Sequence, residues 1–224
     1  MRMPEARGLP FWSAEETEAA IGPTLSHLRD GRVLAYPTET LYGFGTTIDN
    51  SAIERLVTLK RRPPAKPFLL LIADTPMLTR LGLHLPQSAS MLAARHWPGP
   101  LTLVLPGGER RIPDRLRGPE GGVAVRWTPH PGLQRIITAL GDPITSTSAN
   151  RPGEPAATSA REVLEQFGAQ IAQGDVLLLD AGKLGTDTAS TVVDCTGRRP
   201  RVIRPGAIPA DVLRESCPDL VGDR

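Results

Sequence analysis

The segment best suited to chemistry contains two of the chain's three lysines, Lys60 and Lys66, with Arg61 and Arg62 between them. Every other basic side chain except Lys183 is an arginine, so the chain uses an ammonium group sparingly. A lysine ammonium is a compact charge suited to phosphate, whereas arginine offers a planar fork. Prolines at 63, 64 and 67 favour an extended, rigid backbone around these cations. The segment predicts an anion-binding loop, although a solvated basic loop would have the same sequence.

Further polar loops lie at the ends of predicted strands. They combine hydroxyl, amide, glycine and arginine groups, which suit a polyphosphate and a small zwitterion. The set contains no nucleophile paired with a base, so it favours a reaction that depends on positioning and electrostatic stabilisation, as phosphoryl and nucleotidyl transfers do. The first loop, taken alone, is equally typical of a polar turn between a strand and a helix. These loops are 37–45, 146–153, 186–191 and 204–206.

Alternating strands and helices must position these loops. Apolar runs predict strands at 32–36, 68–72, 101–105, 122–126, 144–146, 176–180, 190–194 and 202–204. Helical spacing and capping residues predict helices at 13–30, 51–60, 76–82, 87–96, 131–140 and 159–167. We expect Gly22-Pro23 to break the first helix, segment 107–122 to be a mobile surface loop, and the tail after Ile208 to be peripheral. The pattern predicts an α/β fold with a mixed sheet.

The composition restricts the class of protein. A chain of 224 residues suits one large domain better than two small ones. The net charge of +2 is too small for wholesale nucleic-acid binding. Cys195 and Cys217 form no metal motif or disulfide framework and are expected to be plain thiols. No stretch resembles a signal peptide, and the longest apolar run is far below the roughly 20 residues that cross a bilayer. We therefore expect a cytoplasmic protein without a membrane partner.

Several familiar catalytic motifs are missing. The sequence contains no P-loop, no dinucleotide fingerprint, no paired histidines of a zincin and no C-x-x-C. Its four histidines are scattered, and we expect them to be surface or packing residues. Ser148 has no nucleophile elbow around it, which argues against a serine hydrolase. The sequence predicts no protein metal centre.

Six motifs, in order along the chain, resemble those of the YrdC/TsaC family of threonylcarbamoyl-AMP synthases. They are Pro37-Thr-Glu-Thr-Leu-Tyr-Gly, Leu59-Lys-Arg-Arg-Pro with Lys66-Pro, Trp97-Pro-Gly-Pro-Leu-Thr, Val123-Ala-Val-Arg, Thr147-Ser-Ala-Asn and Ser190-Thr-Val-Val-Asp. One such motif would be weak, but six in order, over roughly residues 20–208, are specific. The resemblance implies a single YrdC-like domain over residues 1–224, with an open, twisted, mixed sheet flanked by helices and a concave basic ligand cleft.

The resemblance also implies a reaction. L-threonine and bicarbonate give a carbamate, whose carboxylate attacks the α-phosphate of ATP and displaces pyrophosphate. Mg²⁺ would accompany ATP by clamping its phosphate oxygens. The product, threonylcarbamoyl-AMP, would pass to a threonylcarbamoyl transferase complex that modifies the adenosine beside the tRNA anticodon. We expect this chain itself to bind tRNA weakly at most.

Roles for individual residues follow from the same resemblance. The family's K-x-R…S-x-N tetrad, which would hold the nucleotide phosphates and supply the catalytic groups, matches Lys60, Arg62, Ser148 and Asn150. Further contacts to ATP are implied for Lys66, Gly122, Ala156 and Arg204. The threonine site would contain Thr38, Thr40, Arg126, Ser146 and Ser190. Arg126 suits the carboxylate of the amino acid, and hydroxyls suit its hydroxyl. Whether Thr38 or Thr40 makes the first contact stays open.

Two features depart from the family pattern. Some relatives have a histidine in the strand after the basic loop, whereas this chain has Phe68-Leu-Leu-Leu71. Long relatives add a second C-terminal domain, whereas this chain ends soon after Arg204-Pro-Gly-Ala-Ile208 and so resembles the short form.

Three alternatives compete with the synthase. A non-catalytic RNA-binding module of the same fold is the first, although aromatic residues make up only 4% of the chain and base stacking needs them. A carbamoyl-transfer domain of hydrogenase maturation proteins is the second, but its acylphosphatase and zinc-finger segments have no counterpart here. A related fold that has lost catalysis is the third, and the intact tetrad argues against it.

Overall fold

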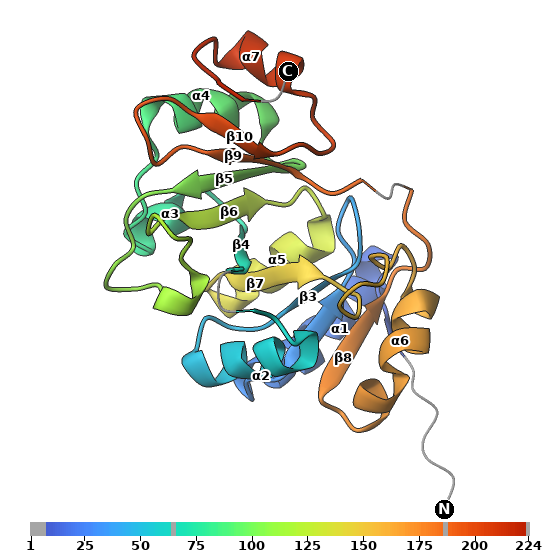
Figure 1. Ribbon diagram of the computed structural model, residues 1–224. Helices are drawn as coiled ribbons and strands as arrows, with labels where there is room; N and C mark the ends of the chain where they lie inside the picture. Colours follow the sequence, from blue (N-terminus) through green and yellow to red (C-terminus); the bar gives the residue numbers. More distant parts are fainter. Residues whose placement is uncertain (1–7, 64–65, 186–187, 223–224) are drawn as a thin grey trace, which may run out of the picture.

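The computed structural model describes residues 8–63, 66–185 and 188–222, and within them ten strands form one open sheet (Figure 1). The strands are β1 (Leu9–Pro10), β2 (Val33–Tyr36), β3 (Gly43–Gly45), β4 (Leu69–Ile72), β5 (Leu101–Leu105), β6 (Val123–Trp127), β7 (Ile144–Ser148), β8 (Val176–Asp180), β9 (Thr191–Asp194) and β10 (Arg201–Arg204).

The sheet is mixed, as the sequence predicts. Its strand order is β1-β8-β2-β3-β7-β4-β6-β5-β9-β10. The pairs β1–β8, β2–β8, β4–β6 and β5–β9 are parallel, and the other neighbours are antiparallel. The α/β class and the open mixed sheet are therefore confirmed. The single domain across residues 1–224 stays a prediction.

Helices cover the sheet and its two ends. They are α1 (Ala14–Arg29), α2 (Asn50–Lys60), α3 (Pro76–Arg80), α4 (Gln87–His96), α5 (Pro131–Leu140), α6 (Ala160–Ala172), α7 (Ala210–Ser216) and a 3₁₀ turn, η1 (Asp114–Leu116). Helix α1 packs against α5, α6 packs against β8, and α4 packs against β5 and α7. Figure 1 shows α6 beside β8 and the α4–α7 pair beyond β10, at opposite ends of the sheet.

The first helix begins as predicted but does not break. Ser13 and Glu16 form a capping box, in which the Glu16 N–H donates to Ser13 Oγ (3.1 Å) and the Ser13 N–H donates to Glu16 Oε2 (2.9 Å). The predicted break at Gly22-Pro23 is wrong, because α1 continues through Pro23. Ala20, Thr24 and Leu28 form one buried face across that point. Burial of this face outweighs the hydrogen bond that proline removes.

Four elements were not predicted: β1, β3, α7 and the 3₁₀ turn η1. Strand β3 contains two glycines, which disfavour strands in general. A Cβ atom at Gly45 would lie 2.0 Å from the carbonyl oxygen of Thr145, so glycine is required where β3 lies beside its antiparallel neighbour β7. The short strand β1 pairs with β8 at the sheet edge. The tail after Ile208 is not peripheral, because α7 buries Leu213 completely against the core.

Segment 107–122 is a structured loop, not a free surface loop. Ile112 and Leu116 are buried and anchor it to the core. Arg117 Nη1 donates to the carbonyl oxygens of Gly107 (3.0 Å) and Gly121 (2.9 Å), which ties the two ends of the segment together. The apolar anchors and this arginine explain why a stretch rich in glycine and charge is ordered.

Candidate functional site

A cavity of about 640 Å³ lies on one face of the sheet. Its lining side chains occupy alternate positions of adjacent strands, and alternate residues of a strand point to the same face. These pairs are Thr102 and Val104 on β5, Ala124 and Arg126 on β6, Ser146 and Ser148 on β7, and Val192 and Asp194 on β9. Loops 38–43 and 118–122 complete the wall. The period-two pattern therefore brings residues from distant motifs to one site.

Most of the predicted ligand-binding residues line this cavity. They are Thr38, Thr40, Arg62, Gly122, Arg126, Ser146, Ser148, Ala156, Ser190 and Arg204. Lys60, Lys66 and Asn150 are not among the lining residues. Thr186 and Asp187, in the predicted hydroxyl-rich loop, lie outside the described residues. The structure thus gathers both halves of the implied site, but not every member of the tetrad.

Arg62 is fixed by the turn that follows α2. Arg61 ends that helix in the left-handed conformation (φ 45°), which turns the chain toward the cavity. Arg62 then donates from Nε to the Lys66 carbonyl (2.6 Å), from Nη2 to the Pro67 carbonyl (2.8 Å) and from Nη1 to Thr147 Oγ1 (3.0 Å). Its guanidinium also lies 4.6 Å from the centre of the Phe68 ring. Every one of these partners is neutral.

The electrostatic setting of Arg62 suits an anion. Burial, and after it the charges of Arg115 and Arg204, lowers the pKa of Arg62 to about 10. Among the described residues, no carboxylate forms an ion pair with Arg62, Arg204 or Lys60. A bound polyanion would therefore relieve repulsion between cations, which favours phosphate at this end of the cavity.

Lys60 lies behind the cavity wall. Its side chain is buried, and Nζ donates to the Ser148 carbonyl (2.8 Å), to Asn150 Oδ1 (2.8 Å) and to the Asn150 carbonyl. These acceptors use all three N–H groups of the ammonium. Burial, and after it the charge of Arg62, lowers the pKa of Lys60 to about 8. Lys60 therefore holds the Ser148–Asn150 loop in place, and its positive charge lies behind the wall of the cavity.

The Ser148–Asn150 loop is bonded internally. Ser148 Oγ donates to Asn150 Oδ1 (2.6 Å), and Asn150 Nδ2 donates to the Glu154 carbonyl (2.5 Å). Ser148 lines the cavity, whereas Asn150 connects Ser148 to Lys60. Lys60, Ser148 and Asn150 thus form one hydrogen-bonded unit. Arg62 is bonded separately, to Thr147 and to the carbonyls of Lys66 and Pro67, and it lines the cavity together with Ser148.

Lys66 contributes its backbone to the site. Its side chain is exposed, and its carbonyl oxygen accepts the Nε–H of Arg62. A contact between its ammonium and the nucleotide stays a prediction.

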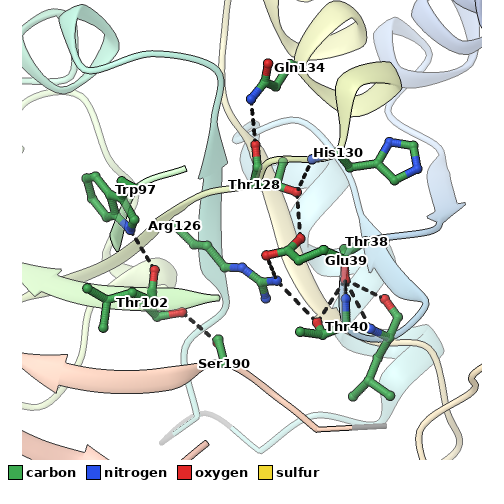
Figure 2. A network of polar contacts seen from close by, with 12 residues as sticks. Thr38, Glu39, Thr40, Trp97, Thr102, Arg126, Thr128, His130, Gln134 and Ser190 are labelled. Carbon is green, nitrogen blue, oxygen red and sulfur yellow. Dashed lines mark hydrogen bonds and ion pairs between the residues drawn. The ribbon is translucent and has the colours of Figure 1, made fainter. Parts of the chain in front are cut away.

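Arg126 is the cation at the other end of the cavity, and it has an anionic partner. It is buried, and its Nη2 donates to Glu39 Oε1 and to Thr40 Oγ1 (3.2 Å) (Figure 2). The buried Nε of Arg126 has no hydrogen-bond partner among the described residues. A buried donor without an acceptor is costly, so an acceptor on a ligand is favoured here. Sequence reasoning did not assign Glu39 a role, although it lies between Thr38 and Thr40 in a motif that was singled out.

The structure distinguishes Thr38 from Thr40. Thr38 Oγ1 donates to the Leu41 carbonyl (2.8 Å) and accepts the N–H groups of Thr40 and Leu41 (both 3.1 Å). Its hydroxyl therefore holds the turn together. Thr40 Oγ1 lies 2.9 Å from Thr38 Oγ1 and also accepts an N–H of Arg126 Nη2 (3.2 Å). Thr40 is the better placed of the two to contact a ligand carboxylate.

Arg204 also lines the cavity and is held by Ser190. Its Nη2 donates to the Ser190 carbonyl (2.7 Å) and to Ser190 Oγ (3.1 Å). Ser190 Oγ lies 2.8 Å from Thr102 Oγ1. The sequence analysis did not assign Thr102 to the site. Only its alternate position in β5 could have indicated that it lines the cavity. Burial, and after it the charge of Arg126, lowers the pKa of Arg204, and Arg204 in turn lowers that of Arg62. Arg204 is thus close enough to both Arg126 and Arg62 for electrostatic coupling.

The cavity lining contains acidic as well as basic side chains. The charged ones are Arg62, Arg126, Arg201, Arg204, Glu120 and Asp194. A basic cleft stays a prediction, because two carboxylates share the wall with the arginines. Leu69, on the strand where some relatives have a histidine, presents an apolar side chain to the cavity.

The histidines and cysteines lie away from the cavity lining. None of His27, His84, His96 and His130 is a lining residue, and His130 stacks on Phe11 with ring centres 5.5 Å apart. Both cysteines are buried free thiols, as expected. Burial raises the pKa of Cys195 to about 12, which makes it a poor nucleophile.

The family model of Sua5, YciO and YrdC proteins, described as "Telomere recombination", matches residues 26–206. The chain belongs to the Sua5/YciO/YrdC family. A threonylcarbamoyl-AMP synthase of Pyrococcus abyssi is 38% identical over 189 residues, which are 84% of this chain and 54% of the relative. A threonylcarbamoyl-AMP synthase of Chromohalobacter salexigens is 39% identical over 183 residues, 80% of this chain and 95% of the relative.

Solved structures agree with this membership of the Sua5/YciO/YrdC family. The crystal structure of P. abyssi Sua5 complexed with L-threonine has a TM-score of 0.84 at 32% identity, covering 96% of this chain and 62% of that one. The chain spans about half the length of the P. abyssi relative in sequence. These enzyme relatives do not favour the RNA-binding alternative.

The described residues form neither a metal-binding cluster nor a membrane-spanning helix. They contain no group of three or more His, Cys, Asp or Glu side chains placed to hold a metal ion. No helix among them is long and apolar enough to cross a membrane.

Proposed function

We propose that this chain is a threonylcarbamoyl-AMP synthase, which condenses L-threonine, bicarbonate and ATP into threonylcarbamoyl-AMP and pyrophosphate. Relatives of this name and the threonine-bound Sua5 support the assignment. One feature of the cavity supports it most directly: three arginines, Arg62, Arg126 and Arg204, line a single space together with several hydroxyl groups. An amino acid and a nucleotide bound to these cations would meet near Arg204.

The Arg62 end is proposed to bind the phosphates of ATP. Arg62 and the hydroxyl of Ser148 face the cavity, and Lys60 adds a positive charge behind them. Because partners of these groups are neutral, their charge is available to a polyanion. Gly122 and Ala156 form small-residue walls beside the nucleotide. A Cβ at Gly122 would lie 2.6 Å from Val104 Cγ1, so a larger residue would displace β5 or narrow the cavity.

The Arg126 end is proposed to bind threonine. The guanidinium and the Thr40 hydroxyl suit the α-carboxylate of the amino acid. Ser146, Ser190 and Thr102 place further hydroxyls in the same region of the lining. A site built from hydroxyls discriminates against an analogue that lacks the substrate's own hydroxyl, because its polar groups are then left unpaired.

The chemistry occurs where the two ends meet. The threonine nitrogen forms a bond to the carbon of bicarbonate, and water leaves. A carbamate oxygen then bonds to the α-phosphorus, whose bond to the pyrophosphate oxygen breaks. Arg204 and Arg62 would stabilise the negative charge that gathers around the phosphorus. No protein nucleophile takes part, so the rate enhancement comes from positioning and charge.

Magnesium is proposed to arrive with ATP. The lining carboxylates Glu120 and Asp194 suit an ion that takes most of its ligands from phosphates and water and at most one or two from protein. When bound, it would neutralise phosphate charge. The absence of a dedicated cluster among the described residues is compatible with such an ion.

The product is a mixed anhydride, and it needs an acceptor. We propose that a transferase complex takes the threonylcarbamoyl group from it to the adenosine beside the tRNA anticodon. A reaction that starts from ATP and ends on tRNA fits the cytoplasm.

Pyrophosphate release from Mg-ATP and bicarbonate tests the proposal. We expect release to require L-threonine, and serine or valine to support it poorly. Release that is absent, or indifferent to threonine, would overturn the synthase assignment.

A further inference from the structure

Glu39 is a carboxylate placed directly behind the threonine end of the cavity. One oxygen, Oε1, is bonded to Nη2 of Arg126, and the other, Oε2, accepts the hydroxyl of Thr128 (2.9 Å). Arg126 and Thr40 line the cavity, but Glu39 is not among the lining residues. The carboxylate therefore acts through Arg126 and does not itself meet a ligand.

A second layer holds Glu39 from the other side. Thr128 Oγ1 accepts the N–H of His130 (3.2 Å), and Gln134 Nε2 donates to the Thr128 carbonyl (2.8 Å). Figure 2 shows this chain of contacts running from the start of α5 through Thr128 to Glu39 and Arg126. Thr128 at the centre of this chain is completely buried, whereas Glu39, His130 and Gln134 are partly buried. Buried polar networks of this kind fix the orientation of the groups they contain.

The hydrogen bonds of Arg126 show what this orientation achieves. Both hydrogens of Nη2 are used, one by Glu39 and one by Thr40, whereas the buried Nε has no partner among the described residues. The guanidinium is thus held along one edge and keeps a donor for a ligand. Its charge is also balanced by Glu39, so the pair offers directed hydrogen bonds more than net charge.

We propose that Glu39 is a positioning residue that sets the orientation and effective charge of Arg126 and thereby selects an amino-acid carboxylate over phosphate at this end of the cavity. The inference rests on the proposed synthase function and adds the origin of its selectivity. An unpaired arginine at this place would attract any anion, including the phosphates of ATP and free pyrophosphate. A compensated arginine favours a ligand that brings its own positive charge, as a zwitterionic amino acid does.

Three variants test this proposal. Glu39→Ala is expected to raise the KM for threonine about tenfold, the equivalent of losing one charged hydrogen bond, while the KM for ATP changes less than about twofold. Glu39→Gln, which keeps an acceptor for Arg126, is expected to raise the threonine KM only about threefold. Both variants should gain inhibition by free pyrophosphate that competes with threonine. Glu18→Ala, which breaks the exposed Glu18–Arg135 ion pair, is the matched control and should change none of these quantities.

Thr128→Val tests the outer layer in a variant that keeps the pair itself. It removes the hydroxyl that holds Glu39 Oε2, and we expect a threonine KM raised about threefold with an unchanged kcat. Thr128→Ser keeps the hydroxyl and should restore the wild-type KM. Calorimetric titration with threonine alone gives a second readout that does not need turnover.

The outcomes separate the two proposals. Wild-type protein that shows no threonine-dependent pyrophosphate release contradicts the synthase function, whatever the variants do. Active wild-type protein whose Glu39→Ala and Glu39→Gln variants are folded, as judged by circular dichroism, and keep the threonine KM contradicts the role of Glu39. Equal increases in the KM for threonine and ATP also contradict it, because they indicate general damage. If Glu39→Ala does not fold, Glu39→Gln and Thr128→Val decide the matter.

Discussion

At one end of the cavity Arg62 is held by two carbonyl oxygens and a hydroxyl, whereas at the other end Arg126 is held by the carboxylate of Glu39 and a hydroxyl. Both arginines line the same space, and neither is free to rotate. The neutral partners leave the charge of Arg62 intact, whereas Glu39 balances that of Arg126. An arginine with neutral partners thus suits a polyanion, whereas an arginine paired with a carboxylate suits a zwitterion.

We infer from the comparison that the hydrogen-bond partners of a cation, more than its residue type, determine which ligand it suits. Lys60 extends the point, because it also donates only to neutral acceptors. Burial, and after it neighbouring cations, lowers the pKa of both Lys60 and Arg62. At the other end, Arg126 forms an ion pair with Glu39. The predictions below test the difference, from the largest effect to the smallest.

Loss of Arg62 should have the largest effect on turnover. Arg62→Ala removes a preorganised donor from the phosphate site, and we expect kcat for pyrophosphate release to fall about 10²–10³-fold. Arg61→Asn is the matched control, because it removes an adjacent exposed arginine and tolerates the left-handed backbone at that position. Steady-state kinetics at saturating ATP would give the comparison. Wild-type turnover in Arg62→Ala would count against the phosphate site.

Coupling energies should differ between the two ends. In a double-mutant cycle, Arg126→Met and Glu39→Gln remove a largely buried ion pair, and we expect them to couple by about 2 kcal/mol, less than for full burial because the Glu39 side chain is 20% exposed. Arg62→Met and Thr147→Val remove a hydrogen bond to a neutral partner and should couple by about 1 kcal/mol or less. Urea unfolding of each variant measures both cycles. Equal coupling at the two ends would remove the distinction.

The charge at the phosphate end should depend on pH. Because Lys60 has a pKa of about 8, the free protein loses this charge as pH rises, and we expect affinity for a non-hydrolysable ATP analogue to fall about tenfold between pH 7 and pH 9. Lys60→Met should remove most of this dependence. Calorimetric titration at the two pH values measures it, and a parallel loss of affinity in both proteins would assign it to another group.

The same pKa gives a prediction for stability. The pKa of folded Lys60 lies below its ordinary value of 10.5, so the unfolded chain binds the extra proton between about pH 8 and 10.5. The free energy of unfolding of the wild type should therefore rise relative to Lys60→Met across that window. A difference that falls, measured by urea unfolding, would contradict the burial of a charged Lys60.

The two threonines should give the smallest effect. Thr40→Val removes the hydroxyl beside Arg126, and we expect the threonine KM to rise a few-fold, about the worth of one hydrogen bond, with ATP unaffected. Thr38→Val removes the hydroxyl that caps the turn and should lower thermal stability, with both KM values moving together. If Thr38→Val instead raised the threonine KM and Thr40→Val lowered thermal stability, Thr38 would be the residue that contacts the ligand.

Local sequence signals predicted the elements whose determinants are local. The capping box at Ser13 fixed the start of α1, and helical periodicity gave α4 and α5 with the bounds found. These local signals failed where contacts with residues distant in the sequence determine the secondary structure. The need for Gly45 comes from the carbonyl of Thr145, and the continuity of α1 past Pro23 comes from burial of its far face.

The sequence predicted many residues that line the cavity, but not the residues that support them from behind. The resemblance to the family implied roles for Arg62, Ser148, Arg126 and Ser190, all of which line the cavity. The burial of Lys60 behind Ser148 and the pairing of Glu39 with Arg126 depend on how α2, β6 and β7 meet, which no single segment determines. The sequence therefore indicated many of the groups that line the cavity, and the structure shows which groups support them.

The most direct test of one cavity that joins threonine to ATP through bicarbonate is the composition of the product. Protein incubated with L-threonine, ¹³C-labelled bicarbonate and Mg-ATP would be analysed by mass spectrometry. We predict a single product that contains AMP, threonine and one labelled carbon, formed together with pyrophosphate. An adduct of AMP and threonine without the labelled carbon, or no adduct at all, would contradict the account.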